Sequence, residues 1–149
     1  MKQRPGLVAN APNADISHKV IGWAMKVHND LGPGHREEVY HNALRERLKQ
    51  DLTFADEPIL YVQDELGNVL LELKPDFAVE DKIIVELKAH VQPLNNDELA
   101  QVFDYFAASE YSLALLFNFG RPRLEWKRLF PPKLILEHRA SRQQTGKRE

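Results

Sequence analysis

Two carboxylates and one ammonium group stand at a spacing that suits a divalent-cation site. Asp76 follows a proline, and Glu86 and Lys88 come ten and twelve residues after it. The intervening Glu80-Asp81-Lys82 has the polar composition of a turn between two strands. A turn centred on Asp81 would place Asp76 opposite Glu86, and Lys88 would share their face because side chains alternate along a strand.

Carboxylates that face each other repel, so this predicted arrangement favours a cation between them. Opposed residues of a strand pair have Cβ atoms about 4.5–5.5 Å apart. Carboxylates are the usual protein ligands of Mg²⁺, and water and phosphate oxygens fill its other positions. Mg²⁺ or Mn²⁺ is therefore the expected cofactor. The alternative is a solvated sheet face, on which Lys88 neutralises Glu86 and no ion binds.

Short runs rich in Val, Ile, Leu and Tyr predict the strands that position these residues. We expect a meander of three strands, then a buried strand and an edge strand, over residues 57–63, 69–79, 82–89, 112–119 and 124–129. In the second and third strands, alternate residues should face the core: Phe77, Val79, Ile83, Val85 and Leu87.

Helices are expected before and within this strand region. Ser17 can cap a first helix, which Gly32-Pro33-Gly34 ends. A second helix is expected over residues 37–49, and Asn95 or Asn96 can cap a third. This order predicts an α/β fold with a small central mixed sheet flanked by helices.

Length and composition indicate one globular domain. The chain has 149 residues and no cysteine, which excludes disulfides, thiolate zinc sites and thiol nucleophiles. No apolar stretch resembles a membrane span or a secretory signal, so we expect a cytoplasmic protein with no membrane partner. The expected parts are an N-terminal arm (1–16), the domain (17–130) and a basic, flexible tail (131–149).

The net charge of −2 conceals an asymmetry along the chain. Residues 1–120 carry 11 basic and 19 acidic residues, a net charge of −8, whereas residues 121–149 carry 9 basic and 3 acidic residues, a net charge of +6. A basic end suits the phosphate backbone of a nucleic acid, although a solvated tail would look the same. The candidate contacts are Arg121, Arg123, Lys127 and Arg128.

Several motifs carry a resemblance to a known family. Pro75-Asp76, nine intervening residues and Glu86-Leu87-Lys88 resemble the PD-(D/E)XK motif of the restriction-endonuclease-like nuclease superfamily. Gly34, Glu37 and Tyr40 resemble the Gly-x-x-Glu-x-x-Tyr signature of the small GxxExxY proteins within it. The similarity covers about residues 17–130 and extends to further positions: Gln101, Tyr105, Asn118-Phe119-Gly120 and Leu124 to Arg128.

The resemblance implies a restriction-endonuclease-like core and individual roles at the site. Asp76 and Glu86 would hold the metal together with the carbonyl of Leu87. Glu37 would be a further ligand or an outer-shell acceptor. Lys88 would position or polarise the attacking water.

Other residues are expected to line the site or to lie apart from it. Gln101 would orient water or a phosphate, and Tyr40 would line the site. Tyr105 would line it too, or would be a core aromatic residue. Three histidines match no compact zinc motif and are expected at the surface or at caps: His28, His35 and His41.

The implied reaction is Mg²⁺-dependent hydrolysis of phosphodiester bonds in DNA or RNA. The alternative is a non-catalytic module that keeps the fold and binds nucleic acid or protein. A third alternative is a toxin or a defence accessory protein, which would show the same sequence features as a nuclease. The resemblance also suggests a homodimer, because small nucleases of this fold often act as dimers. The apolar residues Trp126, Leu129 and Phe130 would form its interface or would equally cover the core.

Overall fold

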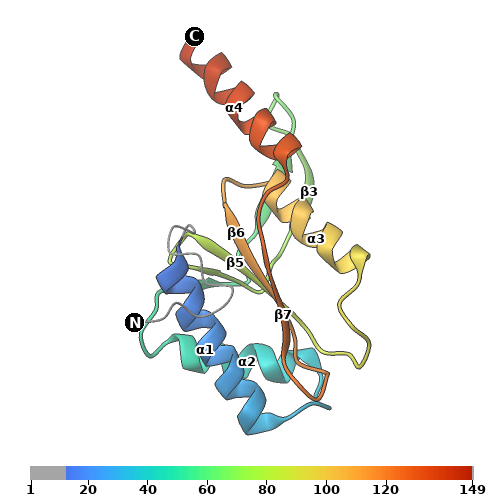
Figure 1. Ribbon diagram of the computed structural model, residues 1–149. Coiled ribbons are helices and arrows are strands. Elements are labelled where there is room, and N and C mark those ends of the chain that lie inside the picture. Colours follow the sequence, from blue (N-terminus) through green and yellow to red (C-terminus); the bar gives the residue numbers. More distant parts are fainter. Residues whose placement is uncertain (1–12, 149) are drawn as a thin grey trace.

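A mixed sheet of five strands forms the centre of the structure, which is a computed structural model describing residues 13–148. The strand order is β1-β4-β5-β6-β7, with β5 and β6 parallel and the other neighbours antiparallel. The bounds are Phe54–Asp56 (β1), Phe77–Val79 (β4), Ile83–Lys88 (β5), Leu113–Asn118 (β6) and Glu125–Leu129 (β7). The predicted α/β fold with a small mixed sheet is confirmed (Figure 1).

Helices cover both faces of this sheet. The helices α1 (Ala14–Leu31) and α2 (Glu37–Leu48) pack on one face, and α3 (Asn96–Ala107) packs on the other (Figure 1). A strand covered on both faces must be apolar at nearly every position. Accordingly, β5 and β6 are buried along almost their whole length. In the described part of the chain, no helix is long and apolar enough to cross a membrane.

The predicted register between β4 and β5 is confirmed. Phe77 pairs with Val85, and Val79 pairs with Ile83. These four residues and Leu87 lie in the core cluster under α1 and α2. The opposite face is packed against α3 rather than solvated, so the alternative is wrong in placing this face in solvent.

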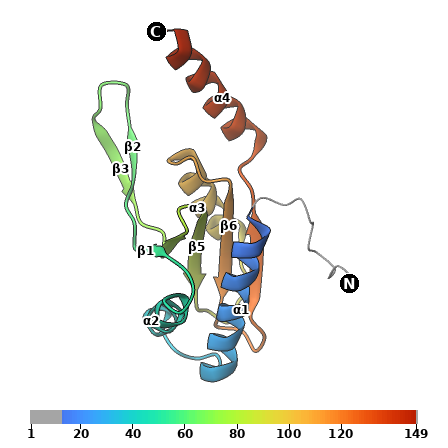
Figure 2. The ribbon, with the colours of Figure 1, turned by 90° about the vertical axis from the view of Figure 1, so that its left-hand side faces the viewer.

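The expected three-strand meander is wrong, because residues 69–79 contribute to two different sheets. Val69–Leu73 (β3) pairs only with Leu60–Gln63 (β2), in a hairpin that projects from the body (Figure 2). Lys74, Pro75 and Asp76 separate it from β4, and the proline lacks the N–H group that a ladder needs. The sequence analysis also missed β1, which pairs with β4.

The first helix begins earlier than predicted. It starts at Ala14, directly after Asn13, so Ser17 is not its cap. Ser17 is buried inside the helix, where its hydroxyl donates a hydrogen bond to the carbonyl of Ala14 at 3.0 Å. Most of the expected N-terminal arm, residues 1–12, lies outside the described residues.

The chain after Pro131-Pro132 is helical, where a flexible tail was expected. The helix α4 spans Lys133–Arg148 and projects from the body (Figures 1 and 2). Arg139 ties its first half to the domain, because its guanidinium donates hydrogen bonds of 2.8 Å to the carbonyls of Phe106 and Tyr111.

Candidate active site

Asp76 lies in the bend before β4, and its carboxylate, its N–H group and its carbonyl all form hydrogen bonds. Its carboxylate accepts hydrogen bonds from the backbone N–H of Leu87 (2.8 Å) and from the ring of His41 (2.7 Å). Its own N–H donates to Glu86 (3.2 Å), and its carbonyl accepts from the N–H of Glu57 (2.8 Å). The side chain is therefore oriented before any ligand arrives.

Glu86 lies beside Asp76, as the predicted register requires. It is only 4% exposed and accepts a hydrogen bond from the hydroxyl of Tyr105. The pKa of Glu86 is raised. Burial has the largest effect, the charge of Asp76 adds to it, and the charge of Lys88 opposes both. The carboxylate pair is thus incompletely compensated by the protein, and a bound cation would stabilise its ionised form.

Lys88 connects the sheet to α3. Its ammonium group donates a hydrogen bond of 2.7 Å to the side-chain oxygen of Gln101 and lies 3.4 Å from the carboxylate of Glu86. The structure therefore brings together Asp76, Glu86, Lys88 and Gln101. These are four of the residues that the sequence analysis placed in one site.

Tyr105 combines the two roles that the sequence analysis left open. It is 1% exposed and belongs to the core cluster under α3, while its hydroxyl reaches Glu86. Burial and the neighbouring Glu86 raise the pKa of Tyr105, so its hydroxyl stays protonated. It is a neutral donor that orients the carboxylate of Glu86.

Glu37 stands at the mouth of the site, in the first turn of α2. The pKa of Glu37 is raised. Loss of solvation has the largest effect, the charge of Asp76 adds to it, and the charge of Lys88 lowers the pKa. Glu37 and Glu38 both line an open hollow with Asp76. Glu37 is the one whose charge interacts with both Asp76 and Lys88.

His41 belongs to the site, so the expectation of a surface or capping role is wrong for it. Its ring is buried, stacks on Phe77 with centroids 4.3 Å apart, and bonds to Asp56 (2.7 Å) as well as to Asp76. Burial lowers its pKa, but the hydrogen bonds to Asp76 and Asp56 outweigh this effect, and the pKa of His41 is raised. The available signal was helical spacing, since His41 follows Glu37 by four residues on the same helix face.

Of the other two histidines, His28 contradicts the expected surface or capping role, whereas His35 agrees with it. His28 is buried, and its ring bonds to the carbonyl of Arg121 at 2.9 Å. His35 is exposed, as predicted.

Tyr40 does not line the site, contrary to the prediction. It is fully buried and stacks on Phe119 with ring centroids 4.8 Å apart. Its hydroxyl donates to the carbonyl of Gly32 at 2.5 Å and accepts from the N–H of His35. Tyr40 therefore fixes the start of α2, and with it Glu37, against the sheet.

Asn118 and Gly120 hold the loop that leads from Lys88 to α3. The buried side-chain oxygen of Asn118 accepts hydrogen bonds of 3.1 Å from the N–H groups of His90 and Gly120. Its amide group donates to the carbonyl of Gln92 at 2.9 Å. At Gly120 the two backbones approach so closely that an added Cβ would lie 2.3 Å from the backbone nitrogen of His90.

Replacing Gly120 with alanine should therefore destabilise the protein by about 1–3 kcal/mol, because the loop backbone must move. Gly22 in α1 is the matched control, since an added Cβ there would meet nothing within 4 Å. Gly22→Ala should stabilise the helix by about 0.5–1 kcal/mol. Urea denaturation measures both variants. Wild-type stability of Gly120→Ala would show that the loop is not held as described.

The four basic candidate residues do not form one surface. Arg121 and Arg123 lie between β6 and β7, at the end of the sheet where Lys88 lies, and Arg121 donates to the carbonyl of Val91. Lys127 and Arg128 are successive residues of β7, so they point to opposite faces of the sheet. Nearness to the site favours the first two as nucleic-acid contacts.

The apolar residues considered for a dimer interface mostly cover the core. Trp126 packs against the cluster under α1 and α2, and Leu129 packs against the cluster under α3. Phe130 is exposed. Trp126 and Leu129 therefore cover the core, which was one of the two roles expected for them.

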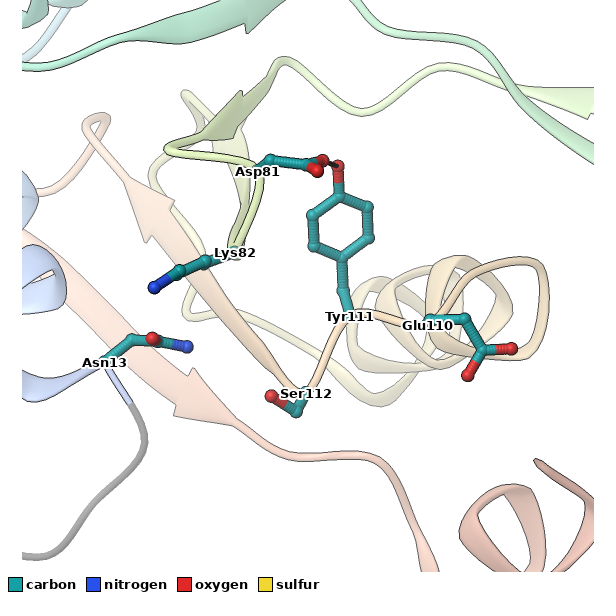
Figure 3. Close-up of a pocket in the computed structure, with 6 residues that line it drawn as sticks. All are labelled: Asn13, Asp81, Lys82, Glu110, Tyr111 and Ser112. Atoms are coloured by element: carbon teal, nitrogen blue, oxygen red, sulfur yellow. Dashed lines mark hydrogen bonds between the residues drawn. The ribbon is translucent and has the colours of Figure 1, made fainter. Parts of the chain in front are cut away.

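A second hollow lies at the opposite end of β5 and β6. Figure 3 shows its lining residues, among which the hydroxyl of Tyr111 donates to Asp81 at 2.8 Å. It lies where β5 and β6 begin, whereas Lys88 ends β5. It is thus separate from the candidate active site.

The donor set of the candidate active site suits a hard divalent cation. Asp76 and Glu86 supply neighbouring carboxylates, and Glu37 adds a third that interacts with Asp76. Among the residues that the structure describes, no three His, Asp or Glu side chains converge closely enough to hold an ion by themselves. Mg²⁺ is commonly bound by one or two carboxylates and otherwise by water and phosphate, so this donor set fits it.

Comparison with known proteins gives one family. The sequence model that matches the chain is described as the PD-(D/E)XK nuclease superfamily, and it matches residues 14–129. No curated protein matches the chain. The matched region runs from α1 to the end of β7 and contains Asp76, Glu86 and Lys88.

Proposed function

The chain belongs to the PD-(D/E)XK nuclease superfamily, and from this membership we propose that it is a Mg²⁺- or Mn²⁺-dependent nuclease acting on DNA or RNA. The observation that carries the proposal is the pair formed by the buried Glu86 and the half-buried Asp76, with the ammonium of Lys88 3.4 Å from Glu86. A merely structural site would gain nothing from placing a second carboxylate beside a buried one, because each raises the energy of the other.

We also propose that the chain is a GxxExxY protein within the superfamily. Glu37 of the signature stands at the mouth of the site, beside Asp76. Tyr40 of the signature stacks on Phe119, which belongs to another motif of the resemblance. These contacts supply a physical reason for the spacing of the signature.

In the proposed mechanism, Asp76 and Glu86 hold the metal, with Glu37 and the carbonyl of Leu87 as further ligands. When bound, the divalent cation lowers the pKa of a water molecule and offsets negative charge on the phosphate. Lys88 orients the attacking water and stabilises the charge that develops as the new P–O bond forms and the bond to the leaving oxygen breaks.

The residues of α3 support these groups. Gln101 fixes the ammonium of Lys88 through its 2.7 Å hydrogen bond, and it is also placed to orient water or phosphate. Tyr105 keeps Glu86 directed toward Asp76. The constellation is therefore assembled before the substrate binds, which reduces reorganisation during the reaction.

A substrate panel tests the proposal. Single-stranded, duplex and branched DNA and RNA are incubated with Mg²⁺, Mn²⁺ or EDTA, beside the Asp76→Asn variant. We expect metal-dependent cleavage of at least one substrate and none by the variant. Binding of nucleic acid without cleavage in any metal would favour the non-catalytic module.

Salt dependence tests the proposed nucleic-acid contacts of Arg121 and Arg123. Each phosphate contact releases counterions, so a double Arg121→Gln, Arg123→Gln variant should flatten the logarithmic salt slope of binding by roughly two units. Glutamine retains a donor for the carbonyl of Val91, which limits structural damage. A variant with Lys82→Gln and Lys133→Gln, which removes the same charge elsewhere, is the control. An unchanged slope in the arginine variant would mean that these residues do not contact phosphate.

A further inference from the structure

We propose that His41 and Asp56 form a positioning device for Asp76, and that metal affinity depends on the hydrogen bond from His41 to Asp76. The inference rests on the proposed function, because it takes Asp76 as a metal ligand. His41 acts through Asp76 and is therefore a positioning residue.

The ring of His41 is fixed by its surroundings. It is buried and lies nearly parallel to the ring of Phe77, at an interplanar angle of 18°. Its Nδ1 and Nε2 atoms each lie 2.7 Å from a carboxylate, of Asp76 and Asp56 respectively. Because carboxylates only accept hydrogen bonds, each ring nitrogen faces a group to which it can donate. The ring cannot turn without losing both bonds.

Asp56 is fixed in turn from two elements. It is the last residue of β1 and pairs with Phe77, the residue that follows Asp76. Its second carboxylate oxygen lies 3.5 Å from the guanidinium of Arg45, which is one helical turn after His41 on α2. A continuous series of contacts therefore runs from Arg45 through Asp56 and His41 to Asp76.

This series opposes the repulsion between Asp76 and Glu86. Without His41, the N–H of Leu87 is the one donor that the described residues 13–148 leave to the carboxylate of Asp76. The side chain would then be free to turn away from Glu86, and binding a metal would require it to be ordered again. Loss of a residue that orients a metal ligand typically costs about 10- to 100-fold in metal affinity.

Three substitutions of His41 separate its two hydrogen bonds from its packing. An asparagine amide occupies nearly the position of Nδ1, so His41→Asn keeps a donor to Asp76. A glutamine amide reaches nearly the position of Nε2, so His41→Gln keeps a donor to Asp56. His41→Phe keeps the stacking on Phe77 and removes both donors.

Mn²⁺ and Mg²⁺ affinities are measured by calorimetry on the full chain without nucleic acid, and thermal unfolding in EDTA confirms folding. We expect His41→Gln and His41→Phe to lose about 10- to 100-fold in affinity, and His41→Asn to stay close to wild type. His28→Gln, which alters a buried histidine bonded to a carbonyl, is the control and should not change affinity.

Equal losses in the three variants would overturn the inference, because packing alone would then explain the effect. Wild-type affinity of His41→Phe would overturn it too. Cleavage is assayed separately with the substrate panel. If the wild type binds metal without cleaving, the proposed function fails while the order of affinities still decides the role of His41. If the wild type binds no metal, both fail.

Discussion

Replacing Lys88 with alanine should lower turnover by about a hundredfold to a thousandfold, while metal affinity stays close to that of the wild type. The ammonium group is fixed by Gln101 and lies beside Glu86, but it is a donor and cannot ligate a cation. Removing one preorganised electrostatic group from a transition state costs on the order of 3–4 kcal/mol. Single-turnover cleavage under saturating Mg²⁺ measures the effect, with calorimetry for the metal.

Lys82→Ala is the matched control for this prediction. Lys82 precedes β5, whereas Lys88 ends it, so the control removes a lysine from the opposite end of the same strand. It should cleave like the wild type. Circular dichroism must show that Lys88→Ala is folded, because its loss leaves Glu86 and Asp76 less compensated. A wild-type rate for folded Lys88→Ala would rule out a PD-(D/E)XK catalytic centre at these residues.

Replacing Glu86 with glutamine should abolish both activity and the stabilisation by metal. A ligand that binds only the folded protein stabilises it by about 2.7 kcal/mol at a hundredfold excess over Kd. Glutamine offers one neutral oxygen in place of the carboxylate, so this stabilisation should disappear. Thermal unfolding with and without Mg²⁺ measures the difference. A full Mg²⁺ shift in Glu86→Gln would place the metal elsewhere.

The same variant should change how stability depends on pH without metal. The folded protein raises the pKa of Glu86 above its ordinary value of 4.5. The contribution of this group to stability is thus complete below about pH 4.5 and is lost as pH rises through the raised pKa. Wild type should lose stability over this range, and Glu86→Gln should lose less.

Other groups contribute to this pH dependence in the wild type and in the variant. The pKa values of Glu37, His41 and His90 are also raised, so their contributions likewise decrease as pH rises. The difference between the two proteins therefore reports Glu86 together with the carboxylate of Asp76, to which its ionisation is coupled. Urea denaturation in EDTA between pH 5 and pH 9, a range roughly spanning these shifts, provides the measurement. Parallel curves would show that Glu86 ionises normally in the folded protein.

The pairing of β4 with β5 was predictable because it is a local matter. A tight turn at Asp81 and alternating apolar residues leave one register that buries Phe77 and Val85 together, since a slip of one residue would reverse the faces. Asp76, Glu86 and Lys88 come together as a consequence. The helices α1, α2 and α3 followed from periodicity in the same way, whereas β1 and α4 were not predicted.

The ends of elements were less predictable, because they depend on contacts outside the segment. Ser17 suits a cap by type, yet the helix extends back to Ala14 and buries it. Pro75 marks an interruption in residues 69–79, but no period in the segment shows that its two parts belong to different sheets. The packing of β4 between β1 and β5 decides that division.

Within the site, the contact of the three charged groups was predictable from the sequence, whereas the distant groups that support them were not. Glu86 and Lys88 lie on one strand and Asp76 across one turn, so backbone geometry suffices to predict their contact. His41 lies 35 residues from Asp76 and 15 from Asp56 in the sequence. Its position depends on how α2 packs over Phe77, and Tyr40 turns into the core for the same reason. Such contacts follow from the burial of many apolar side chains at once, which no short spacing records.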